Sequence, residues 1–230
     1  MADPRGGILF IRQGGQMLYT KDFWYYLLSF LGIACALGLH EYVKARVSFR
    51  QGDPMPKLSG RLRANPFSHL DPLGVAAMLL TGFGWARPAP ASASYYADRR
   101  MGTLITHIIP ILVNIVAACA AAALLTVYKT FLLSSATLPF EGMWRVNFEI
   151  YRTIYFFARA NLAVALFNIL PIYPLDGNAV LEAFLTPNKA LKLKALEKLT
   201  QLILLFLLAV GIISAAFEPV IKAILGFVII

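Results

Sequence analysis

The sequence predicts an all-α integral membrane protein, and its composition and the lengths of its apolar runs support this fold class. Apolar residues make up 59% of the chain, charged residues only 14%, and the mean hydropathy is +0.67. A soluble core of this length does not require so many apolar residues. Several runs also approach or exceed the length that crosses a hydrocarbon core of roughly 30 Å.

Apolar runs define the expected elements in order. About four spans are predicted, at residues 23–39, 102–128, 148–170 and 199–217, within a membrane domain of residues 23–217. Residues 72–86 are apolar but short and contain three glycines, which predicts a re-entrant or interfacial segment. Residues 218–230 form a short C-terminal hydrophobic segment that we expect to be interfacial or partly inserted. A polar segment, residues 1–22, precedes the first span, which we expect to be retained because it lacks a cleavage site.

The net charge of +9 is explained by membrane topology, and no nucleic-acid partner is expected. If residues 72–86 re-enter, most Lys and Arg residues collect in two loops, within 44–100 and 189–198, on one membrane face. If that segment crosses, the bias nearly vanishes. The positive-inside rule therefore places both loops in the cytoplasm, with anionic lipid headgroups beside them.

The cytoplasmic end of the first span carries the run His40-Glu41-Tyr42-Val43-Lys44. It occupies the frame of the H-E-x-x-H motif but lacks the last histidine. In that motif two histidines on one helix face hold zinc, and the glutamate activates the metal-bound water. A lone His-Glu pair is also common at helix ends, but ionisable groups beside an apolar span are costly and usually functional.

A further motif follows the third span, where residues 168–177 read N-I-L-P-I-Y-P-L-D-G. Before the second span, residues 65–74 read N-P-F-S-H-L-D-P-L-G and residues 82–88 read G-F-G-W-A-R-P. Together with the H-E-x-x-H-like helix end, these motifs resemble the site-2 protease family, the M50-type intramembrane zinc metallopeptidases. The order and spacing match compact bacterial members without a PDZ domain, over roughly residues 23–184. This resemblance implies a location in the bacterial inner membrane.

The resemblance also implies roles for individual residues. His40, position 44 and Asp176 would be the zinc ligands, Glu41 the general base, and Asn168 a neighbour of the substrate strand. Independently, the topology predicted from charge puts the ends of the first and third spans on one face. His40 and Asp176 can therefore meet.

Lys44 is the main departure from the family pattern. An ammonium cannot coordinate a metal, so His40 and Asp176 alone should bind zinc weakly. In the second span the family's G-P-x-x-N also reads I-P-I-L-V-N at residues 109–114. No cofactor is therefore expected, and Zn²⁺ only if the protein is active.

Three interpretations of Lys44 are open. Its ammonium could extend to the headgroups as a topology anchor. It could instead take the place of the metal and pair with Asp176 and Glu41, and this is the interpretation we favour. The third interpretation is a rescued metal site that uses a deprotonated Lys44 or His107. For His107 itself, we expect a helix-packing role with a hydrogen bond to a backbone carbonyl.

The sequence therefore predicts a catalytically inactive homologue, or pseudoprotease. We expect a membrane subunit or adaptor that binds transmembrane segments of other proteins, in contact with lipid and within a larger membrane complex. The alternative is an active intramembrane zinc metalloprotease that uses His40, Asp176 and an unorthodox third ligand. A transporter or channel component would need a continuous polar path, which the sequence does not show.

Overall fold

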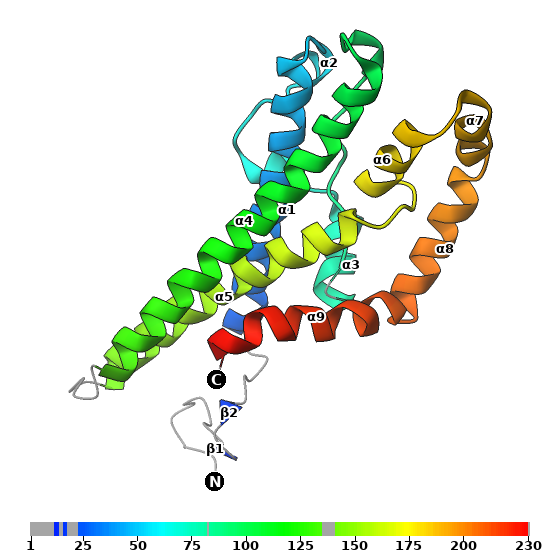
Figure 1. Cartoon of the computed structure of the whole chain (residues 1–230). Coiled ribbons are helices and arrows are strands. Elements are labelled where there is room, and N and C mark those ends of the chain that lie inside the picture. Colours follow the sequence, from blue (N-terminus) through cyan, green and yellow to red (C-terminus); the bar gives the residue numbers. More distant parts are fainter. Residues whose placement is uncertain (1–11, 14–15, 18–22, 82, 135–140, 230) are drawn as a thin grey trace.

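Helices dominate the structure, a computed structural model that describes residues 12–13, 16–17, 23–81, 83–134 and 141–229 (Figure 1). The helices are α1 (Phe23–Arg50), α2 (Met55–Leu58), α3 (Pro72–Thr81), α4 (Arg99–Ser134), α5 (Glu141–Asn168), α6 (Asp176–Phe184), α7 (Pro187–Ala195), α8 (Glu197–Ala209) and α9 (Ile212–Ile229). Two 3₁₀ turns are η1 (Pro66–His69) and η2 (Ala93–Tyr95), and β1 (Arg12–Gln13) pairs antiparallel with β2 (Gln16–Met17). The predicted all-α class is confirmed, and most of the predicted polar segment 1–22 lies outside the described residues.

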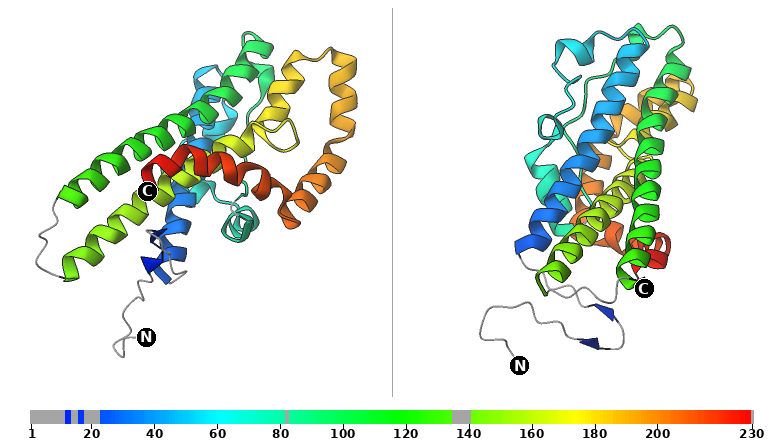
Figure 2. Two further views of the ribbon diagram at one scale, coloured as in Figure 1. Left: turned by 60° about the horizontal axis from the view of Figure 1, so that its bottom comes forward. Right: turned by 90° about the vertical axis from the view of Figure 1, so that its left-hand side faces the viewer.

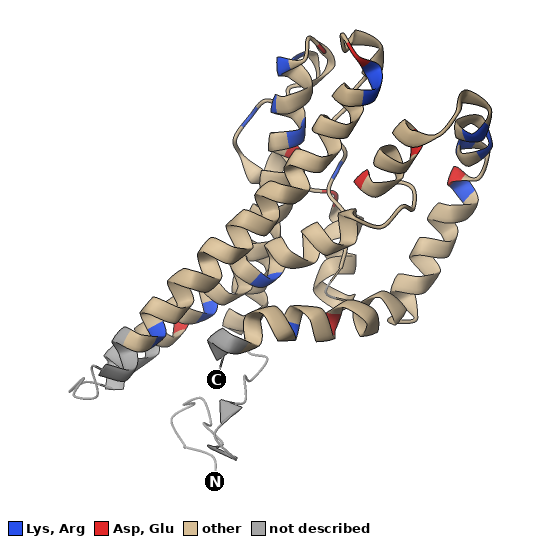
Figure 3. Cartoon of the chain, in the orientation of Figure 1, with Lys and Arg blue, Asp and Glu red and all other residues tan. Residues whose placement is uncertain are grey.

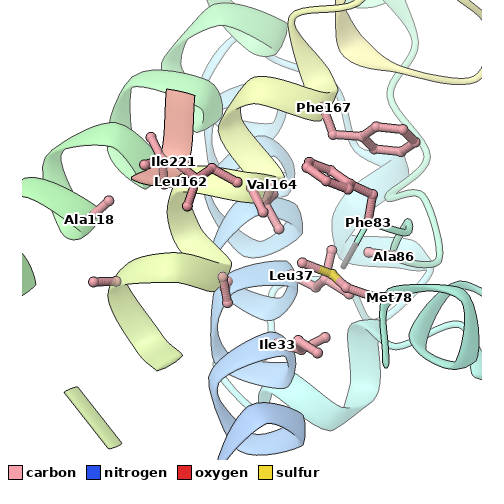
Figure 4. Close-up of a cluster of buried hydrophobic side chains, with 14 of the residues drawn as sticks. Ile33, Leu37, Met78, Phe83, Ala86, Ala118, Leu162, Val164, Phe167 and Ile221 are labelled. Atoms are coloured by element: carbon pink, nitrogen blue, oxygen red, sulfur yellow. The ribbon is translucent and has the colours of Figure 1, made fainter. Parts of the chain in front are cut away.

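Three long helices, α1, α4 and α5, pack side by side and form the centre of the molecule (Figures 1 and 2). At Gly32 of α1 an added Cβ would lie 2.9 Å from the backbone carbonyl of Phe156 in α5, so the two backbones are in close contact. Small residues allow this approach where lipid supplies no hydrophobic driving force. Buried side chains such as Leu37, Val164 and Phe167 belong to one core cluster, in which Phe167 lies beside Phe83 (Figure 4). This packing fixes the end of α1 relative to α5.

The predicted re-entrant segment forms a hairpin. α3 runs in one direction and the following chain returns, so that Leu70 and Ala86 form an antiparallel bridge and Arg87 N donates to His69 O at 2.9 Å. An added Cβ at Gly74 would collide with the carbonyl of Trp85, which explains why glycine occupies this crossing. The segment therefore leaves and returns at one point of the fold.

Length and composition identify fewer spans than the sequence predicted. Among the described helices, α1 and residues 99–130 of α4 are long and apolar enough to cross a membrane, and α8 with α9 would make a third span if the pair counts as one. α5 covers most of the predicted third span, but Arg152 and Arg159 lower its hydropathy. The described helices thus supply two or three spans by this criterion, and the crossing of α5 remains a prediction.

The predicted span 199–217 is not one straight helix. The chain breaks between α8 and α9, which meet at 65°, and Gly211 at the break has φ +77°, a conformation that favours glycine. The apolar run continues through the break, so hydropathy could not reveal it. α9 then packs against α5, where Arg159 Nη2 donates to Glu218 Oε2 at 2.6 Å, and includes most of the predicted C-terminal segment 218–230.

Charged residues are distributed unevenly along the molecule. Lys and Arg gather at the end that carries α2, the start of α4, and α7, whereas fewer lie at the opposite end (Figure 3). Both loops that the sequence predicted to be cytoplasmic therefore lie towards the same end. Which membrane face that end occupies stays a prediction.

Candidate active site

The site lies where the C-terminal half of α1 meets the start of α6. His40 and Lys44 are four residues apart on α1 and so share one helix face. Asp176 begins α6, directly after a non-helical connection from α5. An added Cβ at Gly177 would collide with the backbone carbonyls at the end of α5, so glycine allows α6 to start in contact with α5.

Asp176 is the centre of the site and is only 2% exposed. Its Oδ2 lies 2.7 Å from His40 Nε2, and its Oδ1 lies 2.8 Å from His107 Nδ1. The ammonium of Lys44 donates to the same Oδ1. The structure therefore brings together four residues that the sequence analysis had singled out, from α1, α4 and α6.

The charge of Asp176 follows from these partners. Burial alone raises the pKa of the Asp176 carboxyl, but the charge of Lys44 and the hydrogen bonds of His107 and His40 hold that pKa well below its ordinary value. The carboxylate is therefore ionised, and its negative charge is compensated inside the protein. An uncompensated charge at such a buried position would be strongly destabilising.

Lys44 does not extend to the headgroups. Its side chain is 9% exposed and forms an ion pair with Asp176, so the anchor interpretation is wrong. Glu41, the other expected partner, is also buried, and its Oε2 accepts a hydrogen bond from Ala89 N at 2.6 Å. Glu41 is thus held by the chain that returns after the α3 hairpin.

His107 differs from its prediction as a helix-packing residue bonded to a backbone carbonyl. Its Nδ1 bonds to the carboxylate of Asp176, and its side chain is 16% exposed. The rotation of α4 about its axis turns His107 towards α6, and the sequence of α4 alone does not determine that rotation.

Two asparagines behind His40 were not predicted as site residues. Asn114 Nδ2 donates to Ala36 O at 3.2 Å and to Asn161 Oδ1 at 2.8 Å, and both asparagines are fully buried. With its amide nitrogen committed to these acceptors, Asn114 presents Oδ1 to His40 Nδ1, 2.7 Å away. His40 Nδ1 therefore donates, and Nε2 is the atom directed at Asp176. Their positions inside apolar helices were the available signal, because buried polar residues in membrane spans are usually functional.

A small cavity of about 30 Å³ adjoins the site. It is lined by Leu37, His40, Glu41, Lys44, Trp85, Ala86, Pro88, Asn168, Pro174, Leu175 and Asp176. Asn168 contributes to this wall, while its Nδ2 donates to Val164 O at 2.9 Å. The cavity has room for about two water molecules and none for a peptide strand. A polypeptide could enter only if the surrounding segments moved apart.

A family model described as peptidase family M50 matches residues 23–210. The chain belongs to peptidase family M50. The protein named "Putative zinc metalloprotease YwhC" of Bacillus subtilis (strain 168) is 29% identical over 206 residues, which cover 87% of this chain and 91% of that protein. No solved structure matches the chain. The resemblance to site-2 proteases inferred from the motifs is thereby confirmed.

Because M50 peptidases are zinc enzymes by the motifs described above, the side chains around Asp176 can be compared with the ligands that zinc requires. His40 and His107 carry imidazoles and Asp176 carries a carboxylate, and zinc binds both kinds of group. Here, however, both imidazole nitrogens are hydrogen-bonded to Asp176, whose Oδ1 also accepts from the Lys44 ammonium. Within the described part of the chain, no group of three or more His, Cys, Asp and Glu side chains is arranged to hold a metal ion. As arranged, the residues do not fit zinc.

Proposed function

We propose that this M50 protein is a pseudoprotease: a membrane subunit or adaptor that binds transmembrane segments of other proteins without cleaving them. The observation that carries the proposal is the buried ion pair between Lys44 and Asp176. In the motifs of the family, positions 44 and 176 are occupied by metal ligands. Here an ammonium supplies the positive charge that the carboxylate needs.

The state of Glu41 supports the same proposal. A general base must reach the proton that it abstracts, directly or through one water. Glu41 is instead buried and accepts a short hydrogen bond from the backbone of Ala89. In this arrangement the glutamate fastens the return arm of the hairpin to α1, which is a structural role.

The exposed apolar surface of the helices supports partners within the membrane. Large apolar side chains that are more than half exposed occur on several helices, among them Leu112, Val116, Val127, Leu202, Phe206 and Ile212. Such surfaces suit acyl chains and neighbouring transmembrane helices. We therefore propose lipid and other membrane proteins as partners, within a larger membrane complex.

For the location, we propose the bacterial inner membrane with the basic end of the molecule in the cytoplasm. The distribution of Lys and Arg in Figure 3 supports this orientation. Single cysteines placed at Ser59 and Asn188, both exposed, should react with an impermeant thiol reagent only from the cytoplasmic side, in a background without Cys35 and Cys119. Labelling of the two positions from opposite faces would contradict the proposed orientation and the re-entrant segment.

The function is tested in vesicles that contain the purified wild-type chain or its Glu41→Gln variant. The probe is a synthetic Leu/Ala helix interrupted by a central Asn-Pro, because an unwound segment exposes backbone groups that need partners. We expect substoichiometric zinc after purification without chelator, no cleavage by either protein, and preferential binding over an uninterrupted Leu/Ala helix by energy transfer. Cleavage that depends on Glu41, or no preference between the two helices, would overturn the proposal.

The second candidate is an active zinc metalloprotease, and one observation favours it. His107 lies against Asp176, so a third donor of the type that zinc binds is present beside His40 and Asp176. The name of the Bacillus subtilis relative points to the same activity. Stoichiometric zinc together with Glu41-dependent cleavage of the interrupted helix would establish this candidate in place of the pseudoprotease.

A further inference from the structure

We infer that Arg61 and Arg87 bind the phosphate of an anionic phospholipid at the base of the α3 hairpin, where the Leu70–Ala86 bridge closes it. The inference rests on the proposed function in one respect, the proposal that lipid is a partner, and it adds the lipid class and the site. It does not depend on the pseudoprotease role, because neither arginine contacts Asp176.

The turn η1 brings the two arginines together. Arg61 Nη1 donates to Ser68 O at 2.7 Å, and Arg87 N donates to His69 O at 2.9 Å. Both arginines therefore bond to neighbouring residues of one 3₁₀ turn. Arg61 is only 8% exposed, so its side chain is held in one orientation, whereas Arg87 is exposed.

No carboxylate neutralises this pair of arginines. Within the described part of the chain, neither guanidinium forms an ion pair. All four acidic side chains between residues 40 and 100 accept hydrogen bonds from the backbone instead. Their donors are Ala89 N for Glu41, Met55 N and Ser92 N for Asp53, Leu73 N and Gly74 N for Asp71, and Arg100 N and Met101 N for Asp98. The arginine pair therefore keeps its positive charge.

The two guanidinium groups repel each other. Burial and the charge of Arg87 lower the pKa of the Arg61 guanidinium below 12.5, and the charge of Glu41 offsets only part of this. An arginine remains protonated at neutral pH all the same. The fold thus holds two like charges together, and an anion between them relieves the repulsion. Arginine suits a phosphate in particular, because its planar set of N–H donors matches the phosphate oxygens.

The position of the pair along α1 corresponds to the level of lipid headgroups. η1 begins at Pro66, and an added Cβ at Gly38 of α1 would lie 2.4 Å from the Cβ of Pro66. The first apolar run of the sequence ends one residue later, at Leu39. If α1 spans the membrane, Arg61 and Arg87 therefore lie where the hydrocarbon core gives way to the headgroups.

α3 offers an apolar surface that starts beside the arginine pair. Leu73 and Leu80 are 66% and 86% exposed, and they lie seven residues apart on one face of the helix. Phe67 of η1, which is 54% exposed, adds to the apolar surface at the start of the hairpin. A phospholipid can use both parts, with its phosphate at the arginines and its acyl chains along α3. A free phosphate ion can use only the first.

The inference is tested by native mass spectrometry of delipidated protein in detergent. The probes are dioleoyl-phosphatidylglycerol and dioleoyl-phosphatidylcholine, which share their acyl chains and differ in net charge. We expect the wild type to bind phosphatidylglycerol about tenfold more tightly, as charge-assisted hydrogen bonds from two arginines imply. Arg87→Gln should bind the two lipids equally. Because Arg87 is exposed, this variant should fold and unfold like the wild type in the absence of lipid.

Arg99→Gln is the matched control, because Arg99 is also an exposed arginine but lies at the start of α4. The nearby Gly102 O accepts from Gln51 Nε2, about 20 Å along α1 from Gly38. This variant should keep the preference for phosphatidylglycerol. An unchanged preference in Arg87→Gln, or an equal loss in Arg99→Gln, would overturn the inference. Inorganic phosphate that protects the wild type against thermal unfolding as well as phosphatidylglycerol does would overturn the lipid as the ligand. None of these outcomes affects the pseudoprotease proposal, which zinc content and cleavage test separately.

Discussion

Two buried carboxylates at the same end of the bundle are satisfied in different ways. Asp53, in the loop after α1, has no exposed surface and accepts from Ser48 Oγ at 2.7 Å, Ser92 N at 2.8 Å and Met55 N at 2.9 Å. Asp176, which is 2% exposed, contacts one ammonium and two imidazoles.

This difference shows how a carboxylate with a structural role can be distinguished from one that occupies a catalytic position of the family. The partners of Asp53 are neutral, and two of them are backbone N–H groups that cannot be exchanged for a metal. The partners of Asp176 are titratable side chains from α1 and α4, and all three can be replaced by mutation. Burial therefore identifies both positions, but only the chemistry of the donors separates them.

The largest expected effect is on the ion pair itself. Lys44→Met leaves Asp176 without its ammonium partner, and breaking such a buried pair typically costs about 3–5 kcal/mol of the free energy of unfolding. Replacing both members, Lys44→Met with Asp176→Leu, should cost less than the single change. Thermal unfolding in detergent without zinc measures both, with Lys222→Met as the control. A single variant as stable as the wild type would show that the pair does not stabilise the fold.

Asp53→Ala should come next. It leaves the hydroxyl of Ser48 and two backbone N–H groups without their acceptor, which is expected to cost about 2–3 kcal/mol. Unlike Lys44→Met, this variant leaves no buried carboxylate without its cation, because it removes the carboxylate itself. Thermal unfolding in detergent measures the loss. A loss as large as that of Lys44→Met would remove the distinction between the two carboxylates.

Asn114→Leu tests the support behind His40. It removes the acceptor of His40 Nδ1 and leaves Asn161 Oδ1 and Ala36 O without their donor, at a cost of about 1–2 kcal/mol. Thermal unfolding of the variant in detergent measures the change. A variant as stable as the wild type would mean that His40 is positioned by packing alone.

The smallest effect is expected at the exposed ion pair of Lys194 with Glu182, whose charged atoms are 2.9 Å apart and whose side chains are 56% and 28% exposed. Lys194→Met should change stability by less than about 1 kcal/mol. A hydrogen bond and the charge of Glu182 raise the pKa of Lys194 above 10.5. The contribution is thus complete below the unfolded pKa and is lost as the pH rises through the folded one. Unfolding curves at neutral and at alkaline pH should differ accordingly.

Part of this site could be predicted from the sequence. The H-E frame of His40 and the P-L-D-G run of Asp176 carry recognisable motifs, and the charge bias placed their helix ends on one face. With Glu41 and Asp176 expected nearby, an ion pair was the favoured arrangement for the Lys44 ammonium. The structure brings His40, Lys44 and Asp176 together, as the motifs and the charge bias predicted, whereas their roles and the membrane face stay predictions.

The remainder depends on packing that no local pattern encodes. His107 and Asn114 reach the site only because of the rotation of α4 against α1 and α5, and one helical sequence does not fix that rotation. The break at Gly211 was missed for another reason, because hydropathy averages over a window and the apolar run continues on both sides of the glycine.

The bend between α8 and α9 also affects the surrounding lipid. α8 has 13 residues, so it extends about 20 Å, whereas the hydrocarbon core is about 30 Å thick. If α8 enters the bilayer without the continuation of α9, we expect hydrophobic mismatch at the acyl chains beside it, with local thinning of the bilayer around the bend. Shorter acyl chains reduce this deformation, so the protein should concentrate in the thinner regions of its membrane.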